Sequence, residues 1–519
     1  MANADSSVVG CHIMNRSNTL LFVLLLAVFS ASSCSGPKGV VQCPGGNCGG
    51  NGTLAVTMVA DTLPANPSLL SFQVTIASIK FNASSGTSTT VNLNPALTVD
   101  LMRLQSDTVF LGTFANIPAG QYASATLFLS GNANITFLND TASTLSGCPV
   151  SNICPLSVAA SSTPVATLSF AVSQNVVTGI GIDLNFANAV SISAGNLTVN
   201  FANNNVLSAF TLPRTGSNLA AGQLDLMEDF TGVVSISSPS VTITSATVTG
   251  RGSLMASTTS ATVYDPDPTG THCPTGTTQL VNCVSSNQVA SMDVVLKSDG
   301  TLAIQEIEPL LATLQDTVEG IVVSINSSNQ TQFTLIVTDL LPAAQNFPIG
   351  TLHIGDGLTV NLLNPKPFFV DTKGLQVQNN FGGNFANFSG QTNTTAIHLG
   401  QTVAVHVIAP FTAAVGATIA STTSDTVTLR WSRFTATTSA AAAPAFSITS
   451  FPFNFNASGT ASVEAFAGTQ GADGVTNLDG IASTASLVVN KAVAVRVLFI
   501  ENPGNTLVPA FFAAKVRQH

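Results

Sequence analysis

The chain has 519 residues, of which only 8% are charged, and its formal net charge is −10. Phenylalanine dominates the aromatic residues, with 30 copies against 2 tyrosines and 1 tryptophan. An acidic chain without a run of lysine or arginine is not typical of proteins that bind nucleic acid or grip anionic lipid electrostatically. We therefore expect no nucleic-acid partner.

An export signal is predicted near the start of the chain. Residues 20–29 are apolar, residues 30–33 are small, and Cys34 follows. This order is typical of the hydrophobic region and cleavage site of a signal peptide, and the apolar run is too short to span a bilayer as a mature helix. A start at Met14 would place Arg16 just ahead of the apolar run, which suits a signal peptide better than the longer leader.

The tetrapeptide ASSC at 31–34 resembles the lipobox of bacterial lipoproteins, with alanine where leucine is usual. The resemblance implies that residues 1–33 are a signal peptide and that Cys34 is acylated and anchors the exported protein to a membrane. Ser35 after it favours the outer membrane of the cell envelope. The alternative is an ordinary cleaved signal in which Cys34 is incidental. Residues 34–52 are rich in glycine and predict a flexible tether.

Apart from Cys11 and Cys34, the cysteines form local pairs that each open with Cys-Pro: Cys43/Cys48, Cys148/Cys154 and Cys273/Cys283. Closely spaced cysteines in an exported chain predict disulfides. Metal binding is the alternative, but no pair has CxxC spacing and only His272 lies next to one. Short closed loops add little global stability, so we expect each disulfide to staple a surface loop.

Residues 53–212 are predicted to form an antiparallel β-sandwich, because apolar residues recur two apart between turn-forming Gly, Pro, Asn and Ser. Within this domain, the IPAGQY sequence at 117–122 predicts a tight turn between two strands. Proline fixes φ there and glycine accepts a positive φ. We expect Tyr122 to close the core at the start of a strand. A polar linker is predicted at 213–229.

The IPAGQY turn resembles the LPAGxY hairpin of prealbumin-like and carbohydrate-binding-like β-sandwich domains. The same domain carries LAV at 54–56, FQVTI at 72–76, TVDL at 98–101 and GIDLNF at 181–186. Together these segments resemble an uncharacterised domain family common at the N-termini of bacterial envelope lipoproteins. The resemblance implies a β-sandwich and an envelope location, and it carries no known catalytic residue.

The rest of the chain is predicted to hold three β-repeats, at 230–315, 316–415 and 416–519. Strands that open at Gly232, Gly320 and Gly416 turn at Ser, Asn or Thr and return as β-branched strands. The layout resembles a second uncharacterised family of small β-domains, whose DGTLxAxxIE ending is kept at 299–308. We therefore predict an all-β protein in which a sandwich precedes tandem small barrels or sandwiches.

Motifs for chemistry are sparse. The sequence has no HExxH pairing, and no GxSxG elbow or P-loop in a suitable setting. Asp265 and Asp267 are weak Ca²⁺ candidates, but two carboxylates fall short of the six or more oxygens that Ca²⁺ requires, so an acidic loop is favoured. We expect His398 and His406 to face solvent. No catalytic residue, metal or cofactor is expected.

Two phenylalanine clusters, at 381–388 and 451–455, lie in Gly-, Asn- and Pro-rich surroundings. They could form a sugar-stacking or docking surface. Glycan-binding platforms favour Trp and Tyr, of which this chain has almost none, so core or interface positions are favoured.

Three functions remain open from the sequence. A non-catalytic, lipid-anchored envelope protein that acts as a scaffold or binding module is favoured. The alternatives are a carbohydrate-binding or adhesion lipoprotein and an envelope hydrolase with a dispersed carboxylate site. The expected partners are a membrane, through the lipid anchor, and a glycan or another envelope protein.

Overall fold

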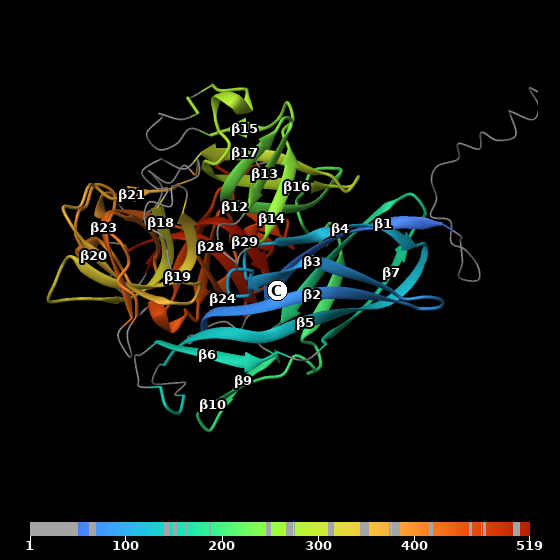
Figure 1. Ribbon diagram of the computed structural model, residues 1–519, viewed down its shortest axis with the longest axis horizontal. Helices are drawn as coiled ribbons and strands as arrows, with labels where there is room; N and C mark the ends of the chain where they lie inside the picture. Colours follow the sequence, from blue (N-terminus) through green and yellow to red (C-terminus); the bar gives the residue numbers. More distant parts are fainter. Residues whose placement is uncertain are drawn as a thin grey trace, which may run out of the picture. The chain divides into compact units, whose positions relative to one another are not determined.

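Strands account for nearly all of the regular structure in the computed structural model of this protein (Figure 1). The structure describes residues 50–61, 69–139, 145–148, 153–160, 163–185, 188–244, 251–265, 273–274, 276–309, 316–342, 352–372, 375, 385–414, 419–455, 459–468, 470, 474–501 and 509–518. These residues belong to one compact unit that spans 46–519. Within these ranges the only helices are single 3-10 turns, so the predicted all-β fold is confirmed.

The N-terminal domain is a β-sandwich of two sheets. Its strands are β1 (Asn51–Asp61), β2 (Leu69–Ala83), β3 (Thr89–Asp100), β4 (Val109–Pro118), β5 (Gly120–Leu138), β6 (Ile153–Ala159), β7 (Val165–Val172), β8 (Val177–Asn185), β9 (Val190–Ser193), β10 (Asn196–Val199) and β11 (Leu207–Thr211). One sheet has the order β11-β8-β1-β4, and the other has β3-β2-β5-β6 with β7 also on β5. The strands β9 and β10 pair with each other in a separate two-stranded sheet. The pairing of β1 with β8 is parallel, so the sandwich is not purely antiparallel as predicted. Alternating side chains such as Leu54, Phe72 and Phe137 fill the space between the sheets.

The predicted turn between two strands at IPAGQY is confirmed, because β4 ends at Pro118 and β5 begins at Gly120. The hairpin pairing that the resemblance implied is wrong, because β4 and β5 belong to different sheets. The chain passes from one sheet to the other at Ala119. Tyr122 is buried as expected, and its hydroxyl donates a hydrogen bond of 2.8 Å to the Pro118 carbonyl. Its ring also stacks on Phe170, with the ring centroids 5.2 Å apart. These two contacts hold the chain in place where it crosses from one sheet to the other.

Three six-stranded sheets follow, which we call barrels 1, 2 and 3. Barrel 1 contains β12 (Gln223–Ser237), β13 (Ser240–Thr244), β14 (Ser253–Ser257), β15 (Val263–Tyr264), β16 (Val289–Lys297) and β17 (Leu302–Pro309). Barrel 2 contains β18 (Asp316–Ile325), β19 (Gln332–Pro342), β20 (Gly357–Leu362), β21 (Phe369–Val370), β22 (Thr402–Val407) and β23 (Ala420–Arg430). Barrel 3 contains β24 (Ser432–Ala440), β25 (Ala445–Thr449), β26 (Ala461–Ala465), β27 (Asn477–Asp479), β28 (Ala492–Glu501) and β29 (Pro509–Gln518).

All three barrels share one topology. In barrel 1, β12 lies between β13 and β16, β14 pairs with β13, and β17 pairs with β16. A parallel contact between β14 and β17 closes the five-stranded barrel, and the short β15 pairs with the far end of β17. Barrels 2 and 3 repeat each of these pairings. This is the strand connectivity of the OB-fold, a five-stranded Greek-key barrel.

The barrels divide the chain differently from the predicted repeats. The strand expected to open the third repeat is β23, which closes barrel 2 by pairing with β20 and β22. Barrel 3 begins at Ser432 rather than at Gly416, which lies outside the described residues. The predicted linker at 213–229 also overlaps β12, which starts at Gln223. First and last strands of a barrel carry the same β-branched alternation, so only their pairing distinguishes them.

Phenylalanine fills the core of barrel 3. Phe451 and Phe455 pack with Phe434, Phe499 and Phe511, with ring centroids 4.7 to 6.4 Å apart. The core interpretation of this cluster is therefore confirmed. In the other cluster, Phe388 is buried against Phe368, whereas its members at 381–384 lie outside the described residues.

We predict that Phe511→Ala lowers the free energy of unfolding by about 3–5 kcal/mol, because the cavity would lie among four other rings. Denaturant unfolding followed by the fluorescence of Trp431, the single tryptophan, measures the change. Val488→Ala is the control, because Val488 is 52% exposed and its loss should cost less than about 0.5 kcal/mol. Equal effects of the two substitutions would contradict the packing described for barrel 3.

Candidate functional site

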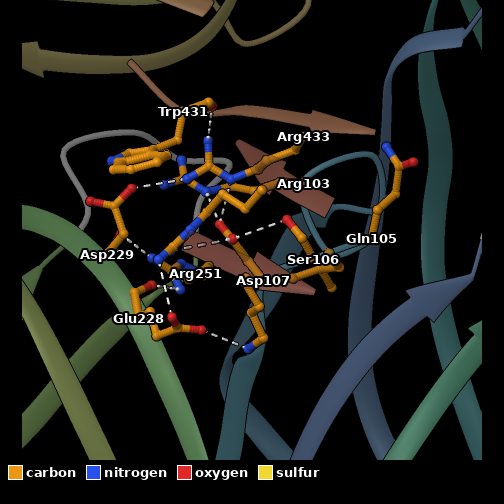
Figure 2. Close-up of polar contacts among 12 residues, drawn as sticks. Arg103, Gln105, Ser106, Asp107, Glu228, Asp229, Arg251, Trp431 and Arg433 are labelled. Atoms are coloured by element: carbon orange, nitrogen blue, oxygen red, sulfur yellow. Dashed lines mark hydrogen bonds and ion pairs between the residues drawn. The ribbon is translucent and has the colours of Figure 1, made fainter. Parts of the chain in front are cut away.

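A cluster of buried charged side chains joins the sandwich to the three barrels (Figure 2). We call it the charged junction, and its members are Arg103, Asp107, Glu228, Asp229, Arg251, Glu319, Asp339, Asp371, Arg430, Arg433, Arg496, Lys515 and Arg517. Apart from Arg16 and Arg214, every arginine of the chain belongs to it. A chain that is poor in charge has therefore placed most of its guanidinium groups inside the protein.

Asp107 of the sandwich lies at the centre of this junction, in the turn between β3 and β4. Its carboxylate is 2.9 Å from Arg433, 3.1 Å from Arg103 and 3.9 Å from Arg496. Burial alone would raise the pKa of Asp107, but Arg433 and the other surrounding guanidinium groups outweigh it and hold this pKa well below its usual range. The surrounding guanidinium groups therefore favour the ionised form of Asp107.

Barrels 1 and 3 contribute opposite charges. Glu228 of β12 lies 3.1 Å from Arg496 and 2.8 Å from Lys515. Asp229, the next residue, lies 2.9 Å from Arg433. Burial would raise the pKa of Glu228, but Lys515 and Arg496 lower it overall. The anionic strand of barrel 1 is thus neutralised by strands β24, β28 and β29 of barrel 3.

The charges sit at equivalent positions of the repeated barrel. Asp293 in β16 pairs with Glu306 in β17, and Arg496 in β28 pairs with Lys515 in β29. Each of these pairs lies one residue along its strands from a pair of buried apolar residues, so the two pairs occupy equivalent positions in their barrels. The same cross-strand position is therefore acidic in barrel 1 and basic in barrel 3. In barrel 2 this position holds His406. The repeats therefore share a fold but differ in charge at the face that meets a neighbour.

Two arginines bind backbone rather than carboxylates of the sandwich. Arg517 donates hydrogen bonds to the carbonyls of Leu104, Gln105 and Asp107, at 3.0, 2.9 and 3.4 Å. Arg251 of barrel 1 donates to the carbonyl of Thr108 at 3.3 Å, and also to carbonyls of β12. The turn after β3 is therefore held from barrels 1 and 3 at once.

Barrel 2 enters the junction through Arg430 at the end of β23. Its guanidinium lies 3.2 Å from Glu319 and 3.6 Å from Asp229, and it also contacts Asp371. Arg103 of the sandwich reaches Asp339 of β19 at 2.8 Å. Each of the four domains thus supplies at least one charge that another domain neutralises.

The charged junction is suited to holding the domains together. Its ionised groups are paired with one another, and the pKa shifts favour the charged forms of Asp107 and Glu228, which suits permanent ion pairs rather than proton transfer. Sequence reasoning missed it. The signal was present in charged residues inside apolar alternation, such as VRV at 495–497 and KVR at 515–517.

A cavity of about 50 Å³ lies beside the charged junction, between the sandwich and barrels 2 and 3. Its walls include Leu70, Met102 and Arg103 of the sandwich, Thr338 of barrel 2 and Phe434 of barrel 3. A second cavity, of about 20 Å³, is lined by Arg214, Asp225, Asp479 and Lys515 among others. It has room for about one water molecule.

The predicted disulfides Cys148–Cys154 and Cys273–Cys283 are both formed, which confirms the disulfide interpretation of these pairs. The predicted lipidation site Cys34 and the third pair, Cys43 and Cys48, lie outside the described residues, as does Asp267. Asp265 directly follows β15, and its backbone N–H donates to the Ile307 carbonyl at 3.1 Å. Among the described residues, no group of three or more His, Cys, Asp or Glu side chains could hold a metal ion.

The expectation that His398 and His406 face solvent is wrong. Nδ1 of His406 lies 2.6 Å from Asp425, whose other oxygen lies 2.6 Å from Lys366. His398 is half-buried near Phe499, and burial lowers its pKa to about 4. Alternation places His406 opposite the barrel interior, but neighbouring segments cover that outer face.

A carboxyl pair bears on the hydrolase alternative. Asp61 and Asp183 lie on the adjacent parallel strands β1 and β8. Burial, and then the nearby Asp61 carboxylate, raise the pKa of Asp183 to about 8, although Arg214 at 3.4 Å opposes the shift. Neither of the two cavities described above is lined by this pair. The raised pKa of one member is typical of an acid–base dyad. Neither of these two cavities, however, would give a substrate access to the pair.

Glu228→Gln keeps the side-chain shape but leaves Arg496 and Lys515 without their shared counter-charge. We predict a loss of about 3–5 kcal/mol in the free energy of unfolding, because breaking one partner of a buried pair strands the other charges. Denaturant unfolding measures this loss. The double variant Glu228→Gln/Lys515→Gln should lose less than the sum of the single variants by about 1 kcal/mol or more. Additive losses would show that the two side chains are not coupled.

The Asp183 pKa predicts a pH dependence of stability. Because the pKa is raised in the folded protein, the protonated carboxyl stabilises the fold fully below about pH 4, and this stabilisation is lost as the pH rises toward 8. Asp183→Asn should therefore gain about 1–3 kcal/mol relative to the parent chain between pH 4 and 8. Melting curves across that range measure the change.

Asp299→Asn is the control for this pH series. Hydrogen bonds from Thr301 lower the pKa of the exposed Asp299 carboxylate, so its contribution changes only below about pH 4. A constant difference between Asp183→Asn and the parent chain from pH 4 to 8 would contradict the assignment.

One protein-family model matches most of the N-terminal sandwich. Residues 51–201 match the family described as a domain of unknown function, DUF4382. No curated protein matches the chain. In the ranges that the structure describes, no helix has the length and apolar character needed to cross a bilayer. The match includes the turn that carries Arg103 and Asp107, so the centre of the charged junction lies within the matched residues. Residues 51–201 are therefore similar to an uncharacterised domain family, in agreement with the resemblance that the sequence pattern indicated.

Proposed function

We propose that the protein is a non-catalytic, lipid-anchored protein of the cell envelope, in which the DUF4382 sandwich and the three barrels act as one rigid scaffold or binding module. The charged junction carries this proposal. A set of buried charges drawn from four domains resists any separation of those domains, because separation would leave each charge without its partner.

Several further observations support the proposal. Two closed disulfides suit an oxidising compartment outside the cytoplasm. The leader at 20–34 has the order of an export signal followed by an acylated cysteine. The most heavily charged region is committed to joining domains rather than to a substrate cleft.

Carbohydrate binding is the second candidate, because OB-fold barrels bind oligosaccharides on the face of their second and third strands. Against it, none of the exposed large apolar side chains in the described part of the chain is aromatic. Sugar rings stack on aromatic faces. A glycan array probed with the purified protein separates the two functions, since a saturable hit would favour the carbohydrate-binding candidate.

The hydrolase alternative is tested at the carboxyl pair Asp61 and Asp183, where the pKa of Asp183 is raised to about 8. A panel of model glycoside and ester substrates should give no turnover that is lost in Asp183→Asn. Turnover that depends on both Asp61 and Asp183 would overturn the non-catalytic proposal.

The anchor is tested at Cys34. We predict that the exported protein partitions with membranes and that its N-terminal peptide carries acyl chains, measured by detergent phase separation and mass spectrometry. Cys34→Ser should release the protein into the aqueous phase. Cys11→Ser, which alters the leader upstream of the proposed cleavage site, should leave the acylation unchanged. An unmodified, water-soluble parent protein would overturn the lipid anchor.

A further inference from the structure

An asparagine, a lysine and an arginine form a row across three neighbouring strands of barrel 3. Asn477 of β27 pairs with Lys515 of β29, and Lys515 pairs with Arg496 of β28. The three side chains point to the same side of the sheet, because each of them contacts the carboxylate of Glu228 in barrel 1. A second domain therefore covers the row, and Asn477, its most exposed member, is only 7% exposed.

The carboxylate of Glu228 holds a nucleophile and an electrophile together. Its Oε2 lies 2.8 Å from Nζ of Lys515, a primary amine once it has lost a proton. Its Oε1 accepts a hydrogen bond of 2.5 Å from Nδ2 of Asn477, whose Cγ is an amide carbon. Because both nitrogens contact one carboxylate, the amine and the amide are held side by side. Two groups held in this way react far faster than the same groups in free solution.

A lysine amine and an asparagine amide in this arrangement can undergo transamidation. Lys515 gives a proton to Glu228, and the lone pair of its Nζ then attacks Cγ of Asn477. Glu228 passes protons on to Nδ2, the bond between Cγ and Nδ2 breaks, and this nitrogen leaves as ammonium. The protons that Nζ loses are those that the leaving nitrogen gains, so atoms and charge balance without an oxidant, a reductant or any other reactant.

We infer that Nζ of Lys515 forms an isopeptide bond with Cγ of Asn477 in the folded protein, and that Glu228 transfers the protons. Because Glu228 belongs to barrel 1 and the bond lies within barrel 3, the bond forms only once these two barrels are docked. It then ties β27 to β29 covalently. This single, irreversible step goes beyond the proposed scaffold function, consumes no outside substrate and does not depend on the lipid anchor.

The surroundings of the row suit this reaction. The cavity of about 20 Å³ described above is lined by both Lys515 and Asn477, and it has room for about one molecule of the size of water or ammonia. Burial opposes the ionisation of Glu228, but Lys515 and Arg496 lower its pKa overall, which keeps it in the form that accepts the first proton. Glu228 ends the reaction as a carboxylate, and Arg496 at 3.1 Å remains its counter-ion.

The test is mass spectrometry of the purified full chain after tryptic digestion. Trypsin does not cleave at a lysine whose amine is acylated, so the peptides 434–491 and 497–517 should appear as one branched species. Its mass should be that of the two peptides less one molecule of ammonia, and fragmentation should place the branch between Asn477 and Lys515. Separate, unmodified peptides from protein that unfolds cooperatively would overturn the inference. Conversion of Asn477 to aspartate without a branch would also overturn it, because water would then be the nucleophile.

Asn477→Ala removes the electrophile and keeps the ion pair between Lys515 and Glu228, so it should fold and lose the branched peptide completely. Asn454→Ala is the matched control, because Asn454 is another buried asparagine of barrel 3 and lies outside the row. It should keep the branch. Folded Glu228→Gln should also lose the branch, because an amide cannot take up the proton of Lys515. A branch that persists in Asn477→Ala contradicts the bond, and one that persists in Glu228→Gln contradicts the role of Glu228.

Discussion

The structure depends on one electrostatic constraint, which is the neutralisation of Asp107. A carboxylate removed from water is costly unless cations and hydrogen bonds replace the solvent. The groups that do this here come from three places in the chain, namely Arg103 from its own turn and Arg433 and Arg496 from barrel 3. Barrels 1 and 2 complete the balance through Asp229 and the other junction carboxylates. No single domain can satisfy its own buried charges.

This dependence explains how repeats of one fold can assemble in a fixed order. The three barrels share their strand pairings, so backbone geometry alone would allow any barrel to occupy any place. Acidic side chains in barrel 1 and basic side chains at the equivalent positions of barrel 3 remove that ambiguity, because two like barrels would bring like charges together. Buried ion pairs add little net stability over apolar packing, and their value lies in this specificity.

The family match covers only part of the compact unit to which the sandwich belongs. The residues that match DUF4382 end near the last strands of the sandwich. The turn at 101–108, which lies within the match, is nevertheless bound by residues hundreds of positions further along the chain. Arg517 binds the Gln105 carbonyl across a separation of 412 residues. In this protein the sandwich and the barrels therefore have to be considered together, and the cavity between them is a property of the assembly rather than of one domain.

The sequence by itself determined the features that depend on near neighbours. Alternation of apolar residues predicted strands and an all-β fold, short Cys-Pro loops predicted the two disulfides that the structure describes, and composition placed Phe451 and Phe455 in a core. Each of these follows from residues a few positions apart. Tertiary structure alone decided that IPAGQY joins two sheets, that β23 closes barrel 2, and that Arg496 and Lys515 face Glu228 of β12. Strand partners and charge partners are chosen across long separations, and a local pattern of alternation is the same whichever partner is chosen.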